Sequence, residues 1–212
     1  MTPPDVRAVA LRRGHTLPRM IGQHRRREEA IPTGTPARSR FEVDPLACAV
    51  MISARSNVGA VRFGTRTIRG IIDVVPSSDG VDLDSQPRAR LEIPLSDLTS
   101  GNALYDSELQ QRLDVRRFPL ATLDLTEARV LGDLDYGVDG TVTLHGVAAT
   151  LRGNVTLQFP EPGVLTVTGE HVVDIRDFDI DLPTVLMLRL YPDVRVSMQL
   201  LARQIDHTEE SS

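Results

Sequence analysis

Between Tyr136 and Leu157 the chain alternates between apolar and polar residues on both sides of the pair His145-Gly146. A period of two indicates half-buried β-strands, because successive side chains leave opposite faces of a pleated strand. Threonine and valine suit strands, and glycine suits a tight reversal. The segment therefore predicts a long antiparallel hairpin, from which the remaining strands pair outward.

The same alternation recurs along most of the chain, with turn signals between the alternating segments. The clearest examples are residues 48–54, 81–83, 88–95, 121–130, 165–175 and 194–200. No long helical pattern interrupts them, which makes a parallel sheet a poor fit. About eight such strands can close into an antiparallel barrel or form a filled β-sandwich, and the pattern alone is compatible with both.

One stretch, residues 95–119, departs from this alternation. Leu104, Leu109 and Leu113 recur there at near-helical spacing, and Ser96 or Thr99 can cap a turn. We expect short helices here that close one mouth of a barrel.

The hairpin reads Tyr-x-Val-x-Gly-x-(small apolar)-Thr-(apolar)-His-Gly-Val, followed by a returning amphipathic strand. This pattern resembles the central signature of the YceI-like family, and the similarity extends roughly from Phe41 to Arg203. The resemblance implies an all-β fold, an eight-stranded antiparallel lipocalin-like barrel that binds a polyisoprenoid or related lipid chain in its interior. It also favours the barrel over the sandwich.

Several positions depart from the family pattern. Ala47 and Ser56 stand where relatives usually have histidine, Tyr105 replaces an arginine, and Asp179 replaces a glycine. The loss of the arginine leaves Asp106 without its usual partner, which Arg112, Arg116 or Arg117 could replace. The loss of the glycine puts the backbone turn at Asp179 in doubt.

The inward-facing stripe is the candidate ligand-binding site. It is largely aliphatic, and its alternative interpretation is a plain packed core. The predicted residues are Val50, Ile52, Ala54, Leu91, Ile93, Leu123, Leu125, Val138, Val142, Leu144, Val155, Leu157, His171, Val173, Val196 and Met198. A strand of about ten residues spans roughly 33 Å, enough for an extended isoprenoid tail.

Charge divides the chain unevenly. The net charge is −5, which argues against nucleic acid as the main partner. Residues 1–40 carry nine arginines against three acidic residues, a net +6, whereas the remainder carries fifteen arginines against twenty-six acidic residues, a net −11. We expect a basic, mostly disordered arm over 1–40, a barrel domain over 41–204 and a polar tail over 205–212. The arm could contact an anionic membrane surface weakly or remain solvated.

Motifs for catalysis or metal binding are weak. The histidines show no HxH or HExxH spacing, and no glycine-rich phosphate loop or GxSxG sequence occurs. His145 lies at the hairpin turn, where we expect it to bond backbone locally. Four carboxylates lie near Arg176 and could hold a cation, but solvated charges at a strand edge explain them as well: Asp174, Asp177, Asp179 and Asp181.

Cys48 is the single cysteine, which excludes an intrachain disulfide, and we expect it to be buried and inert.

The first hypothesis is therefore a non-catalytic lipid-binding barrel with no cofactor or metal, which sequesters or carries a polyisoprenoid, quinone-like or similar amphiphile. Its head group is expected at the mouth near residues 99–118. The alternatives are an enzyme that uses His145, His171 or Asp106 as acid or base, and a ligand-free interaction module. No apolar run long enough for a transmembrane helix or a secretory signal is seen, which favours the cytoplasm. The resemblance also implies a homodimer.

Overall fold

The computed structural model describes residues 38–78, 80–181, 184–185 and 188–205, and the predicted disordered arm and polar tail lie almost wholly outside these residues. The strands are β1 (Ser39–Val43), β2 (Ala49–Ser56), β3 (Gly59–Thr65), β4 (Arg69–Val74), β5 (Pro76–Ser77), β6 (Gly80–Val81), β7 (Arg88–Pro94), β8 (Leu120–Val130), β9 (Asp135–Leu144), β10 (Val147–Glu161), β11 (Val164–Asp174), β12 (Thr184–Val185) and β13 (Leu188–Ile205). The helices are α1 (Ala103–Arg112) and two 3-10 turns, η1 (Leu95–Asp97) and η2 (Ile175–Phe178).

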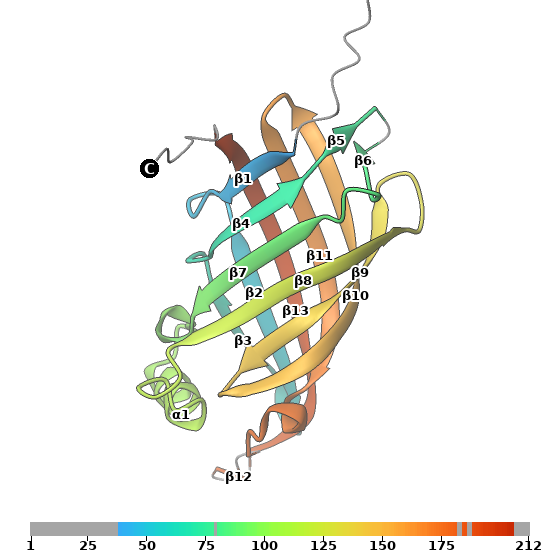
Figure 1. The fold of residues 1–212 in the computed structure, drawn as a ribbon. Coiled ribbons are helices and arrows are strands. Elements are labelled where there is room, and N and C mark those ends of the chain that lie inside the picture. The colour runs from blue at the N-terminus through green and yellow to red at the C-terminus, as the bar shows by residue number, and fades with distance from the viewer. Residues whose placement is uncertain (1–37, 79, 182–183, 186–187, 206–212) are drawn as a thin grey trace, which may run out of the picture. The chain divides into compact units, whose positions relative to one another are not determined.

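The main sheet closes on itself. Its order runs β1-β4-β7-β8-β9-β10-β11-β13, and β13 pairs back with β1, so that the described part of the chain forms a closed eight-stranded antiparallel barrel (Figure 1). This confirms the predicted fold class. Closure leaves no free edge between β1 and β13, because each supplies the other's hydrogen bonds.

Two of the eight barrel strands are interrupted. β13 pairs with β2 between Leu190 and Gln199 and with β1 between Ala202 and Ile205, so β1 and β2 together form one broken strand. β3 and β4 form the next in the same way, since β3 pairs with β2 and β4 pairs with β1. The first break is held by Asp44, whose N–H donates to the Leu201 carbonyl at 2.8 Å.

The predicted central hairpin is present as β9 and β10. Leu144 pairs with Val147, which leaves His145 and Gly146 as a two-residue turn in which both residues have positive φ, 53° and 79°. Positive φ at both positions is the type I′ geometry, whose twist matches that of antiparallel strands. Glycine adopts it without strain, which explains why this pair joins the strands.

Two sequence expectations differ in detail. The strand predicted at 81–83 is only the two-residue β6, which pairs with β5 in a small separate hairpin because Pro87 and the turn before it end the alternation. The helical expectation at 95–119 is fulfilled by η1 and α1. In Figure 1 α1 lies at one end of the barrel and the β5–β6 hairpin at the other.

The packed interior consists of two groups of apolar side chains. The larger surrounds Phe41, Ile68 and Leu165, which are almost completely buried. The smaller joins Leu95 and Leu98 to Leu113, Phe178 and Ile180, so it binds the helical segment to the barrel end. None of the described helices is long and apolar enough to cross a membrane.

Candidate functional site

A cavity of about 820 Å³ runs through the barrel. Its wall extends from the β2–β3 turn and α1, at one end, to Leu83 and Pro87 after β6, at the other. Such a volume lies within the range of about 300–1,000 Å³ typical of ligand pockets. The side chains that line the barrel therefore do not fill its interior.

The structure places all sixteen predicted interior residues in the wall of this cavity. Val50, Leu91 and Leu157 are buried, whereas Ile93, Leu123 and most of the others keep part of their surface accessible although they point inward. In a filled core the same side chains would be covered by neighbours. The geometry thus favours an open interior over a plain packed core. That these residues bind a ligand remains a prediction.

Further wall residues were missed by the sequence reasoning. Four of them occupy inward-facing positions of strands that the sequence predicts, so strict alternation would have identified them: Tyr136, Ala89, Ala121 and Leu151. Those from α1 could not be found this way, because their contact with the cavity depends on how the helix docks on the barrel.

Exposed apolar side chains mark the end of the cavity near α1. Val58 in the β2–β3 turn is 74% exposed, and Leu104 and Tyr105 on α1 are 65% and 36% exposed, yet all three line the cavity. Burial of such residues by an amphiphile that enters here would be favourable. We call this opening, between α1 and the β2–β3 turn, the α1 mouth.

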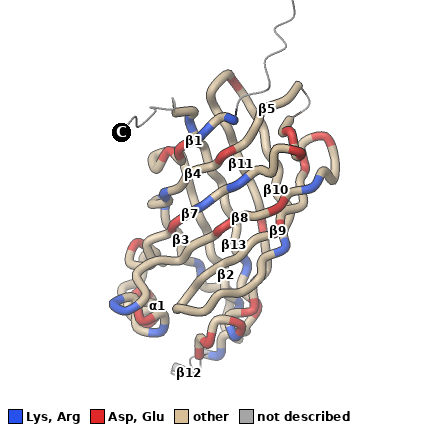
Figure 2. Tube along the Cα trace, in the orientation of Figure 1, with Lys and Arg blue, Asp and Glu red and all other residues tan. Residues whose placement is uncertain are grey.

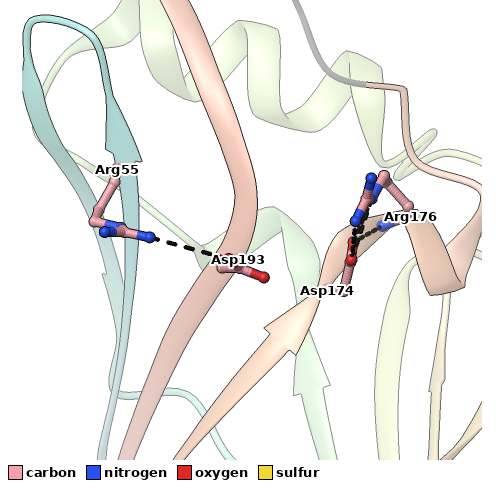
Figure 3. Close-up of polar contacts among 4 residues, drawn as sticks. All are labelled: Arg55, Asp174, Arg176 and Asp193. Atoms are coloured by element: carbon pink, nitrogen blue, oxygen red, sulfur yellow. Dashed lines mark hydrogen bonds and ion pairs between the residues drawn. The ribbon is translucent and has the colours of Figure 1, made fainter.

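Charges of both signs surround this end of the barrel, around α1 and the segment before β12 (Figure 2). Two ion pairs lie near the strand ends on this side (Figure 3): Arg55 on β2 lies 4.0 Å from Asp193 on β13, and Arg176 in η2 turns back onto Asp174. The Arg176 guanidinium holds the pKa of the Asp174 carboxyl below its ordinary value through hydrogen bonds. Asp174 is thus engaged by an arginine, and no cluster of three or more metal-ligating side chains occurs within the described ranges.

Asp106 finds partners other than the predicted arginines. The Ser100 hydroxyl and N–H each donate to its carboxylate at 2.6 Å, and the Thr99 hydroxyl donates at 2.7 Å. These hydrogen bonds, first those from Ser100, lower the pKa of Asp106. Arg112 instead pairs with Glu108 one turn earlier, at 2.8 Å. Ser100 and Thr99 bond Asp106 in place of the arginines because they lie in the loop directly before α1, within reach of the first helical turn.

His145 also differs from expectation. Its Nδ1 lies 3.1 Å from the carbonyl oxygen of Phe178, and its ring meets Phe118 edge-on at a centroid distance of 5.1 Å. The imidazole therefore ties the β9–β10 turn to η2, far away in sequence, instead of bonding backbone locally. Of the three residues considered as acid or base, only His171 lines the cavity.

Cys48 is buried, as expected. Its thiol donates to the Asp44 carbonyl at 2.9 Å, and burial raises the pKa of the thiol. Both effects disfavour the reactive thiolate.

Asp179 keeps the turn that a glycine would make. It adopts the left-handed conformation, with φ 54° and ψ 33°, at the end of η2. Aspartate tolerates this region better than most residues, so the substitution preserves the backbone path.

Comparison with protein families identifies a YceI-like domain over residues 41–202. The chain belongs to the YceI-like family. This confirms the resemblance seen in the hairpin sequence. Comparison with curated proteins gives no match.

Solved structures of similar fold include BcnA from Burkholderia cenocepacia, with a TM-score of 0.64, 18% identity and coverage of 75% of this chain and 98% of that one. A polyisoprenoid binding domain from Saccharophagus degradans has a TM-score of 0.61 and 14% identity, and the alignment covers 78% and 98% of the two chains. The YceI protein of Campylobacter jejuni has a TM-score of 0.58 and 15% identity, with coverage of 69% and 86%. At these identities the likeness shows a shared fold.

Proposed function

We propose that this YceI-like barrel binds a polyisoprenoid or similar amphiphilic lipid in its cavity and sequesters or carries it without covalent chemistry. The observation that carries this proposal is the open interior, lined by aliphatic side chains that keep accessible surface. An apolar chain would cover that surface and remove it from water.

The energetics are ample for a chain of modest length. Each buried methylene contributes about 0.8 kcal/mol, so one five-carbon unit contributes about 4 kcal/mol before its costs. Several units would exceed the practical limit of about 20 kcal/mol for non-covalent binding. Lost chain entropy and imperfect fit must offset much of the gain, and we therefore expect loose selection of chain length.

The α1 mouth offers a route of entry. Val58 and Leu104 are exposed at the rim and line the same cavity as the apolar wall, so a lipid tail can contact apolar side chains from the rim to the interior. The similar domain from Saccharophagus degradans is described as polyisoprenoid binding, which is consistent with this ligand class.

A binding role fits the chemistry of the wall better than catalysis. General acid–base catalysis requires positioned titratable groups within hydrogen-bond reach of the substrate. Of the three candidate groups, Asp106 is engaged by Ser100 and Thr99 outside the cavity and His145 by the Phe178 carbonyl, so that only His171 lines the cavity. Cytoplasmic location, a homodimer and the role of the basic arm remain predictions.

The test compares two neighbouring residues of β9. Val142 lines the cavity and Thr141 alternates with it on the outer face. Val142→Trp should occupy the cavity and lower the affinity for added polyprenol at least tenfold, whereas Thr141→Trp should bind as the wild type does. Binding is measured on delipidated protein by displacement of a fluorescent prenol, and circular dichroism checks that both variants fold. Equal affinity of the two folded variants would refute binding in the barrel.

A further inference from the structure

Two polar side chains lie at inward-facing strand positions of the cavity wall, Tyr136 on β9 and His171 on β11. Tyr136 is only 4% exposed, because it is buried in the group around Phe41 and Leu165, and its hydroxyl accepts the N–H of Val81 at 3.2 Å. Other polar wall residues on strands, such as Asn154 and Glu170, are exposed and occupy outward-facing strand positions. His171 is therefore the remaining inward-facing polar group of the described wall.

The surroundings of His171 leave its ring accessible. Across the sheet stands Gly153, which has no side chain, and a Cβ built there would lie 3.9 Å from the His171 Nδ1. On the other side His171 pairs with Val196 of β13. No hydrogen bond joins the imidazole to any other residue in the described ranges. Since every fully buried polar side-chain atom in these ranges has a hydrogen-bond partner, the unbonded ring nitrogens of His171 are not fully buried. The ring nitrogens thus retain contact with the open cavity.

His171 also lies where the two packed groups of the interior meet. Val173, two residues on, packs against the group around Leu95 and Phe178, whereas Val196 packs against the group around Phe41 and Leu165. The imidazole is therefore inside the barrel and not at its rim. An apolar ligand chain that covered it there would leave its nitrogens without hydrogen bonds, which is costly.

The charge of the wall limits the partner that His171 can take. No arginine occupies an inward-facing strand position of the described wall, and Arg112 at the α1 mouth pairs with Glu108. A phosphate group beside His171 would therefore find no guanidinium on the inner faces of the described strands with which to pair. An imidazole N–H, in contrast, can donate to an uncharged oxygen, which needs no charged partner in the wall.

We propose that His171 hydrogen-bonds an uncharged oxygen of the ligand, a hydroxyl or a ring carbonyl, inside the barrel. The ligand is then a prenyl alcohol or a prenylated ring whose polar end reaches past the α1 mouth to the level of Gly153, and not a prenyl phosphate held at the rim. This inference rests on the proposed lipid-binding function and specifies the ligand class of the same site.

The experiment compares three probes on delipidated full-length protein: geranylgeraniol, geranylgeranyl diphosphate and the hydrocarbon with the same carbon skeleton. Dissociation constants are measured by displacement of a fluorescent prenyl reporter for the wild type, His171→Leu and His171→Gln. The wild type should prefer geranylgeraniol over both the hydrocarbon and the diphosphate about tenfold, the effect of one hydrogen bond in an apolar site. His171→Leu should abolish the preference over the hydrocarbon, and His171→Gln should retain most of it.

The outcomes separate this inference from the function on which it rests. If no probe binds the wild type, both the lipid-binding function and the role of His171 are wrong. If the probes bind and His171→Leu keeps the wild-type preference, or if the diphosphate binds best, only the role of His171 is wrong. Because His171→Gln keeps a polar group of similar reach, a loss caused by misfolding would appear in both variants and in their melting curves.

Discussion

At the scale of single residues, two glycines permit close approach between strands. A Cβ on Gly70 of β4 would lie 2.4 Å from the Arg90 carbonyl oxygen and 2.6 Å from Leu91 Cδ2. A Cβ on Gly140 of β9 would lie 2.5 Å from the Asp124 carbonyl oxygen. Real Cβ atoms do not approach backbone atoms this closely, so the strands can pack at this distance only because both positions are glycine.

We therefore predict that Gly70→Ala lowers the free energy of unfolding by about 2–3 kcal/mol, because β4 and β7 must move apart. Gly64→Ala on β3 is the matched control. Its Cβ would meet nothing nearer than 3.5 Å, and its effect should stay within about 1 kcal/mol. Urea denaturation measures both, and equal effects would contradict the packing described.

A second residue-scale prediction concerns Asp106. Its pKa is lowered in the folded protein by hydrogen bonds from Ser100 and Thr99. A carboxyl with a depressed folded pKa contributes stability above its unfolded pKa of about 3.9, and loses it as the pH falls through the folded value. The melting temperature of the wild type should therefore fall more steeply below about pH 5 than that of Asp106→Asn. Parallel melting curves over this range would show that the Asp106 hydrogen bonds do not affect stability.

Residue identities predicted some local features and not others. The pair His145-Gly146 was enough to place the turn, because the I′ turn requires residues that accept positive φ. The partners of His145 and Asp106 were not predictable, since Phe178 approaches only when η2 folds against the barrel end, and Ser100 reaches Asp106 only through the loop before α1. At Asp179 the residue identity suggested a change that did not occur, because the aspartate keeps the left-handed turn of the family glycine.

At the scale of elements, α1 is anchored mainly at its end. The helix has no buried residue of its own, and Asn102 caps its start by accepting the N–H of Leu104 at 3.0 Å. Leu113, directly after the helix, is only 6% exposed and packs with Leu95 and Phe178. The position of α1 at the mouth thus depends chiefly on Leu113, with a smaller contribution from the partly buried Leu109 of the helix itself.

Leu113→Ala should accordingly cost about 2–5 kcal/mol and should release α1 from the barrel. Hydrogen exchange is expected to accelerate over 103–112, while β9 and β10 stay protected. Leu104→Ala, which removes a side chain that is 65% exposed, serves as the control and should leave exchange in the helix near that of the wild type. Unchanged exchange in Leu113→Ala would contradict this anchoring role.

Element boundaries were predictable where a strand is long and alternates on both sides of a clear turn. β8, β9 and β10 satisfy this condition, because each faces water on one side and the cavity on the other. The small β5–β6 hairpin and the break between β1 and β2 were not, since their pairing is set by distant partners such as Leu201 and Tyr136.

At the scale of the whole barrel, periodicity cannot distinguish an open interior from a filled one. Both give the same inward stripe, and the difference lies in the circumference that eight paired strands enclose. Closure of β13 onto β1 and the partial exposure of residues such as Ile93 and Leu123 indicate the open form. The family resemblance led to the barrel, but the cavity emerged only from the three-dimensional arrangement.

The central claim is that this cavity holds a lipid, and the most direct test is to identify what the protein carries. Native mass spectrometry of gently purified protein, followed by organic extraction and lipid analysis, should reveal a prenyl chain with an uncharged polar end at near-stoichiometric occupancy. The bound form should revert to the mass of the polypeptide after extraction and regain the adduct when the lipid is returned. Protein that is empty as isolated, and that takes up neither polyprenols nor prenylquinones afterwards, would contradict the account.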